Sequence, residues 1–327
     1  MADTPYVPNL TRPHWGGPAS DADIHLEVFD GALDTAFQYN AFFRSNSTFI
    51  SVNDRSNTAR IDRLGTVVIK GRQSGEALES TAVRNDKLVI TVDTVTYART
   101  PIDYQDDWTA PDFLPAIGKN HGTEHAKLFD TAHIIQLQKS RTWIAPAHLK
   151  PAFYDGFEKT AQLNADPSVS ADAISAAHAS GIEELINRDL GGSLNEFITL
   201  VSPRVFGILM QSEKLVNVQY SDGNANFAQR RMAFLNGTRI VETARFPRAV
   251  ITDHPLGTAF NVDAADIACE VLVYHPDMTL VTVEAKAHTT RVWDDELNFA
   301  NVLDSYGMYT IGQRRPDTAF AVRLIPA

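Results

Sequence analysis

Apolar residues recur with helical spacing in several parts of the chain. An apolar stripe runs from Val28 to Phe37, a second is clearest between Leu128 and Ile135, and a third lies between Ile174 and Ile186. Such stripes predict helices that bury one face. We therefore expect helices near 28–37, 112–142 and 172–189, and a short one over 203–215. The first of them docks either on its own domain or on a neighbouring subunit.

Runs rich in β-branched and aromatic residues predict the strands. They occupy 66–70, 87–92, 197–201, 238–243, 269–274, 303–313 and 318–324. Helices and strands alternate between residues 151 and 274, which indicates a compact α/β unit. The last two runs are joined by a turn in which Pro316 restricts the backbone. We expect the final strand to complete a sheet.

The first two strands enclose a polar stretch, residues 71–86, and together they predict a long hairpin. An isolated two-stranded ribbon is only marginally stable in water. Either the parent domain or another chain must therefore cover it. The charged residues of this hairpin are Lys70, Arg72, Glu76, Glu79, Arg84, Asp86 and Lys87.

Composition narrows the class of protein. A chain of 327 residues is longer than a single hydrophobic core usually accommodates, so two cores, or one core with extensions, are expected. Its content of 44% apolar and 21% charged residues is typical of a globular protein. The net charge of −11 argues against tight nucleic-acid binding, which needs Lys and Arg at the phosphates. No apolar stretch is long enough to span a bilayer, and the N-terminus lacks the pattern of a secretory signal. The single cysteine, Cys269, excludes an internal disulfide and indicates a reducing compartment.

One short motif has catalytic potential. His121, Glu124 and His125 match the H-x-x-E-H pattern, in which two histidines bind zinc and the glutamate acts as a base. Gly122 weakens the helix that this geometry requires, and no third ligand is evident. A zinc-dependent hydrolase is therefore the alternative of a different class, and a chance match is the simpler explanation. Asp103, Asp106, Asp107 and Asp112 are better explained as residues that favour a helix start, and Cys269 as buried packing.

The order of the parts carries a resemblance. The segments that carry it are 25–37, then 87–93, then Tyr306-Gly307-Met308 with Gly312 and Arg315-Pro316-Asp317 before the last strand. In this order the chain resembles the major capsid proteins of tailed bacteriophages, the Hong Kong 97-like family, and is most similar to those of short-tailed phages. The resemblance implies an α+β fold. Its expected parts are an N-terminal arm and helix (1–58), an extended two-stranded E-loop (59–97), a peripheral domain with a long spine helix (98–146 and 277–327) and an axial α/β domain (147–276).

The resemblance also implies a function. The chain would be a structural subunit, not an enzyme, that assembles with itself as hexamers and pentamers into an icosahedral head. It would need no cofactor, would sit in the virion after assembly in the host cytoplasm, and would enclose double-stranded DNA without binding it specifically. A separate scaffolding protein and a portal protein are implied partners, and decoration proteins stay open. An encapsulin-type nanocompartment shell is the closest alternative.

Two sets of residues are expected to contact neighbouring subunits. The E-loop set is Lys70, Arg72, Glu76, Glu79, Arg84 and Lys87. The N-terminal set is Trp15, Phe29 and Phe37.

Overall fold

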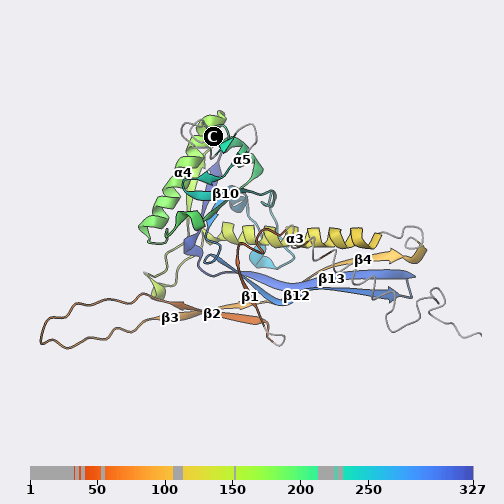
Figure 1. The fold of residues 1–327 in the computed structure, drawn as a ribbon, viewed down its shortest axis with the longest axis horizontal. Helices are drawn as coiled ribbons and strands as arrows, with labels where there is room; N and C mark the ends of the chain where they lie inside the picture. Colours follow the sequence, from red (N-terminus) through yellow and green to blue (C-terminus); the bar gives the residue numbers. More distant parts are fainter. Residues whose placement is uncertain are drawn as a thin grey trace, which may run out of the picture. The chain divides into compact units, whose positions relative to one another are not determined.

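The chain folds into two compact units. The structure, a computed structural model, describes Leu33, Phe37 and residues 41–52, 56–105, 113–150, 152–212, 225–226 and 231–326. The first unit comprises Val95–Leu128 and Lys286–Met308 together with the start of the chain up to Ala41. The second comprises Phe42–Thr94, Phe129–Ala285 and Tyr309–Ala327. Figure 1 shows the elements along the chain.

A four-stranded sheet has the order β1-β12-β13-β4. Its strands are β1 (Thr48–Ser51), β12 (Leu280–Asp295), β13 (Ala300–Gln313) and β4 (Val95–Asp103). Within the first unit, β4 pairs antiparallel with β13 from Val95↔Met308 to Asp103↔Ala300. Leu33, Ile102 and Leu303 form a small buried core beside this pair. Within the second unit, β1 runs parallel to the start of β12.

The long helix α3 spans Phe113–Ser140, which confirms the helix expected near 112–142. Pro115 is compatible with a helix that begins at Phe113, because a proline in the first turn removes no hydrogen bond that the helix would otherwise make. Phe129, Ile134 and Leu137 lie on its fully buried part. Asp130, also buried, accepts hydrogen bonds from the backbone amides of Phe42 (3.1 Å) and Phe43 (3.2 Å) in the second unit.

A six-stranded mixed sheet with the order β5-β14-β11-β6-β10-β9 dominates the second unit. Its strands are β5 (Phe157–Gln162), β14 (Phe320–Ile325), β11 (Cys269–Tyr274), β6 (Ile198–Val201), β10 (Thr238–Glu242) and β9 (Phe234–Leu235). Helices α4 (Pro167–Asn187) and α5 (Pro203–Leu209) contribute Ile174, Leu185 and Leu209 to the same core as Val271 and Phe320. The predicted α/β unit is confirmed, and the final strand does complete a sheet. The two last strands of the chain thus belong to different sheets. Strand β14 pairs with strands of the segment 147–276, whereas β13 lies in the four-stranded sheet.

Several predicted boundaries are wrong. Helix α4 begins five residues early, since Asp166 caps it by accepting from the Ser168 amide and Pro167 takes the first position. The helix after Ser202 ends at Leu209 among the described residues. The shorter elements are β7 (Ala225–Asn226), β8 (Arg231–Met232) and α8 (Ala264–Ile267).

The predicted hairpin exists, but its first strand is misplaced. Strand β2 covers Thr58–Leu64 and pairs antiparallel with β3, Asn85–Thr91, as a separate two-stranded sheet. Residues 66–70 are outside any strand. Their β-branched side chains predict a strand, but in this fold they have no partner strand opposite them.

Candidate assembly surface

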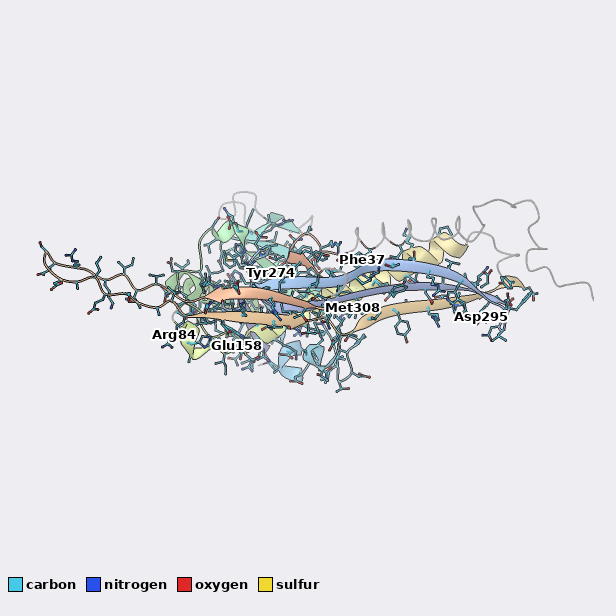
Figure 2. All side chains as sticks on the ribbon, turned by 90° about the horizontal axis from the view of Figure 1, so that it is seen from below. Phe37, Arg84, Glu158, Tyr274, Asp295 and Met308 are labelled. Carbon is cyan, nitrogen blue, oxygen red and sulfur yellow. The ribbon has the colours of Figure 1, made fainter. Side chains whose placement is uncertain are left out.

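The hairpin loop, residues 65–84, is the most exposed described segment of the chain. Every residue from 66 to 84 is exposed. Ile69 is 94% exposed and Leu78 is 83% exposed, and Val67, Val68 and Val83 are also exposed. Figures 1 and 2 show the loop as an extended excursion beyond β2 and β3, and Arg84 marks its return. Exposed apolar side chains grouped on one segment are typical of an interaction surface.

The charged residues of the loop mainly contact each other. Lys70 Nζ lies 2.8 Å from a Glu79 carboxylate oxygen, and the two side chains are 43% and 76% exposed. Arg72 donates to the Glu76 carbonyl, and the Glu76 carboxylate accepts from the Gln73 amide at 3.2 Å. Exposed ion pairs contribute about 0–1 kcal/mol, so these contacts shape the loop more than they stabilise the fold.

The root of the hairpin, in contrast, packs on its own unit. Buried Arg63 of β2 donates from Nη2 to the carbonyls of Gln313 (2.9 Å) and Arg314 (2.8 Å). Ile90 of β3 packs so closely on Gly312 that an added Cβ there would lie 2.3 Å from Ile90 Cδ1. The Gly65 amide donates to the Arg84 carbonyl at 2.8 Å and closes the ribbon. The ribbon is therefore anchored at one end and bare at the other.

Sequence reasoning did not identify the anchor. Arg63 is a charged residue on a strand and gives no periodic signal of burial. Its partners are backbone carbonyls 250 residues away, which leave no trace in residue types.

The N-terminal contact residues are only partly described. Trp15 and Phe29 lie outside the described residues. Phe37 is helical, 3% exposed, and its ring centroid lies 4.5 Å from that of His288 in the same unit. At this position the helix docks on its own domain, which favours the first of the two alternatives.

The two histidines of the zinc motif lie together, but Glu124 does not join them. His121 Nε2 lies 2.7 Å from Thr100 Oγ1, and Ser305 Oγ lies 3.0 Å from both His121 Nδ1 and His125 Nε2. Glu124 is exposed and pairs with Lys127, away from the two buried histidines. Among the described residues, no three His, Cys, Asp or Glu side chains are grouped to hold a metal ion. The geometry does not support the hydrolase alternative.

The remaining candidate groups have structural surroundings. Asp103 accepts from the Gln105 amide at 2.8 Å, as expected at a helix start, and Asp106, Asp107 and Asp112 lie outside the described residues. Cys269 is fully buried, and burial raises the pKa of its thiol to about 12, which keeps it protonated. None of the described helices has the length and apolarity of a bilayer span.

The buried histidines predict that acid weakens the fold. Burial lowers the pKa of His133 and His178 to about 3 and, with help from His121, that of His125 to about 4. The folded state holds these rings neutral, while the unfolded chain takes up protons near pH 6.5, so stability is lost as pH falls below that value. Each ring is expected to cost about 2 kcal/mol between pH 7 and pH 5. Urea denaturation at the two pH values measures the loss.

Asp130 opposes this trend and supplies the control. Burial raises its pKa to about 6, so the folded state binds a proton more tightly than the unfolded chain. Its contribution therefore grows as pH falls through 6, by roughly 1–2 kcal/mol at pH 5. Asp130→Asn removes this offset, so the variant should lose stability more steeply than the wild type. Equal or rising stability toward pH 5 in the wild type would contradict the assignment.

Comparisons with known proteins agree with this geometry. Neither the known sequence families nor the curated proteins provide a match. Among solved structures, the asymmetric unit of the bacteriophage PhiM1 mature capsid is 62% identical, with a TM-score of 0.81 over 99% of both chains. The cyanophage P-SCSP1u capsid is 16% identical with a TM-score of 0.73, over 88% of this chain and 89% of that one. A virus-like particle from Pyrococcus furiosus is 12% identical with a TM-score of 0.55, over 91% and 99%.

The two distant matches show only a shared fold. The match to PhiM1 is close enough to decide between a phage capsid and a nanocompartment shell, and it favours the phage capsid. Both the expected α+β capsid fold and the expected structural role are confirmed. The chain belongs to the family of tailed-bacteriophage major capsid proteins with the Hong Kong 97-like fold, and it is a structural subunit of the capsid.

Proposed function

We propose that the β2–β3 hairpin is the E-loop through which one subunit contacts the next, and that the subunits assemble as hexamers and pentamers. The observation that carries the proposal is the bare hairpin loop, whose apolar side chains no described residue of the chain covers. An anchored root with an uncovered end fits a segment that is completed by another copy. The expected division into 1–58, 59–97, 98–146 with 277–327, and 147–276 is part of this proposal.

The energetics favour repeated weak contacts. Full burial of a Val, Leu or Ile side chain contributes about 1.5–3 kcal/mol. Ile69 and Leu78 alone therefore supply several kcal/mol at each contact, before the cost of ordering the loop. Because every subunit both gives and receives a hairpin, modest contacts add up to a durable shell. Contacts of this head-to-tail kind close into rings when the rotation from one subunit to the next divides a full turn.

The charged residues are assigned to register. Arg84 and Lys87 are exposed near the root, and Lys70, Arg72, Glu76 and Glu79 lie along the loop. Opposite charges across an interface determine orientation and partner choice more than affinity. These six residues are therefore proposed as inter-subunit contacts that align the hairpin. Trp15 and Phe29 keep their proposed role as inter-subunit contacts. Phe37 is buried in its own unit, so its proposed contribution to the contact is indirect: it holds in place the helix that carries it.

The wider setting follows from charge and family. The net charge of −11 suits a container that encloses DNA without holding it. A scaffolding protein and a portal protein are the proposed partners during assembly in the host cytoplasm, with decoration proteins as a further class of partner. A short-tailed phage is the proposed source of the capsid.

The double variant Ile69→Ser/Leu78→Ser tests the hairpin contact. Because both side chains are in water in the single subunit, the thermal midpoint should stay within about 1 °C of the wild type. The yield of shells should fall at least about tenfold, since each contact loses more than 1.4 kcal/mol. Sedimentation velocity and negative-stain microscopy measure the yield.

The matched control lies in the same loop. Ser80→Ala/Thr81→Ser changes two exposed polar residues and should leave both the midpoint and the yield unchanged. Wild-type yields from the apolar double variant would refute the proposed contact.

A further inference from the structure

The root of the hairpin borders a cavity of about 380 Å³. This volume falls within the range of roughly 300–1,000 Å³ that is typical of ligand pockets. Strand β2 and the first loop residues form one wall, and the other walls come from chain segments that are distant in sequence. The lining residues outside 61–66 are Ala152, Phe153, Arg314 and Arg315. The cavity therefore lies where the hairpin joins its own unit.

A buried arginine with spare donor capacity lines this cavity. Arg63 is 8% exposed, and the two carbonyls of Gln313 and Arg314 use only its Nη2. Its Nε is buried and has no hydrogen-bond partner among the described residues. A buried donor without an acceptor costs about 1–3 kcal/mol, so an acceptor that reached this nitrogen through a small shift of the side chain would stabilise the site.

Two further arginines add positive charge. Arg315 donates to buried Asp317 at 3.2 Å, and its guanidinium lies 4.9 Å from the Phe153 ring centroid. Arg314 donates to the Asp277 carbonyl at 3.2 Å, and no carboxylate of the described residues lies within ion-pair distance of it. Its charge is thus not neutralised by a described neighbour.

The acids near the cavity already face cations. Asp62 lines the cavity but stands opposite Lys87 in the β2–β3 register, and Asp86 stands opposite Arg63. Asp86 and Asp317 both lie near enough to act on the charge of Arg63, and Asp317 also pairs with Arg315, so Arg314 is the lining arginine that no carboxylate among the described residues pairs with. Guanidinium groups bind carboxylates and phosphates through paired N–H donors, and among the unmodified side chains of a protein only Asp and Glu offer such an acceptor.

We propose that this cavity binds a carboxylate side chain, and that a second copy of this chain supplies it in the assembled capsid. The second part rests on the proposed hairpin contact, which brings copies together beside this root. The chain has 40 acidic against 29 basic residues, so a neighbouring copy is rich in carboxylates. A bound carboxylate would bridge β2 to Arg314 and would fix the direction in which the hairpin leaves its unit.

Succinate serves as the probe for the unassembled subunit. In nitrogen-15 NMR spectra, the Arg63 Nε–H resonance should shift and saturate as succinate is added. In Arg314→Ala, the apparent affinity should fall at least about tenfold. No shift in the wild type, or the same titration in both proteins, would overturn the site.

Assembly tests where the carboxylate comes from. Arg314→Glu should lower the rate of shell formation about tenfold, with the thermal midpoint of the subunit unchanged. Arg248→Glu, the same charge change at an exposed arginine elsewhere in the second unit, should have no effect. If Arg314→Glu no longer binds succinate but still forms shells at the wild-type rate, the carboxylate does not come from a second copy. That result would overturn this part of the proposal and would leave the hairpin contact intact. A separate experiment tests the hairpin contact itself. Normal shells from Ile69→Ser/Leu78→Ser would refute that contact.

Cryo-electron microscopy of assembled wild-type particles identifies the donor. An acidic side chain of another copy should lie within hydrogen-bond distance of Arg314. A cavity that is empty, or filled by residues of its own chain, would contradict the proposal.

Discussion

A subunit in which residues 66–83 are replaced by a short Gly-Ser turn is expected to fold normally and to form no shells. The hydrogen bond between the Gly65 amide and the Arg84 carbonyl, 2.8 Å long, closes the ribbon just below the excised segment. All the excised residues are exposed, so their loss removes almost no buried area. The thermal midpoint should therefore be unchanged or slightly raised, because a shorter loop costs less closure entropy. Circular dichroism and sedimentation velocity measure the two outcomes.

A second replacement distinguishes the contribution of the loop's apolar side chains from that of its length. An equally long Gly-Ser loop keeps the length of the hairpin but removes its apolar side chains. It should fail to assemble as well, because the burial of Ile69, Leu78 and their neighbours provides the contact energy. Closed shells from the short variant would refute the role of the hairpin, and closed shells from the long variant would show that length alone suffices.

Gly156→Ala is expected to have the largest effect on the fold. A Cβ at this position would lie 2.0 Å from the Ser140 carbonyl oxygen and 3.0 Å from that of Arg141, both backbone atoms at the end of α3. The Gly156 amide also donates to the Trp143 carbonyl at 2.8 Å, so the segment has little freedom to retreat. Either the end of α3 or the start of β5 must move. We expect a loss of at least about 4 kcal/mol in the free energy of unfolding, measured by urea denaturation.

The matched control is a glycine with free space. Gly207 lies within α5, and a Cβ there meets nothing within 4 Å. Gly207→Ala should stabilise the protein by up to about 1 kcal/mol, since alanine favours a helix. If Gly156→Ala were as stable as the wild type, the close approach of β5 to the end of α3 would be contradicted.

The secondary structure of the second unit was largely predictable. Strand β11 was predicted with its bounds, because Cys269–Tyr274 is an apolar run that only Glu270 interrupts and that the turn residues His275-Pro276-Asp277 follow. Element ends were harder. The start of α4 depends on the Asp166 cap, a single side-chain contact that competes with several plausible caps nearby.

The hairpin shows why pairing is harder to predict than strand character. Residues 66–70 carry the stronger β signal, yet the paired strand is Thr58–Leu64, where Arg60, Asp62 and Arg63 interrupt the apolar pattern. Distant contacts decide this choice: Arg63 on the Gln313 carbonyl and Ile90 against Gly312. The apolar residues left over, including Val68 and Ile69, are exposed in the single subunit. A strong β pattern without a partner strand thus fits the proposed assembly surface.

The inter-subunit role of the charged hairpin residues stays a prediction, and the structure shows only that these residues are exposed. The arginine cluster around Arg63 was not predicted, because it forms only when β2 meets the turn after β13. The zinc motif illustrates the reverse error. His121 and His125 share a buried helix face, whereas Glu124 lies on the exposed face. A match at three sequence positions does not reveal which face each side chain occupies.

Cryo-electron microscopy of shells assembled from the purified protein tests the central claim most directly. In each subunit, Ile69 and Leu78 should be buried against an adjacent copy, with the hairpin root still held by Arg63. Shells in which the hairpin loop stays in solvent, or folds back onto its own chain, would contradict the account.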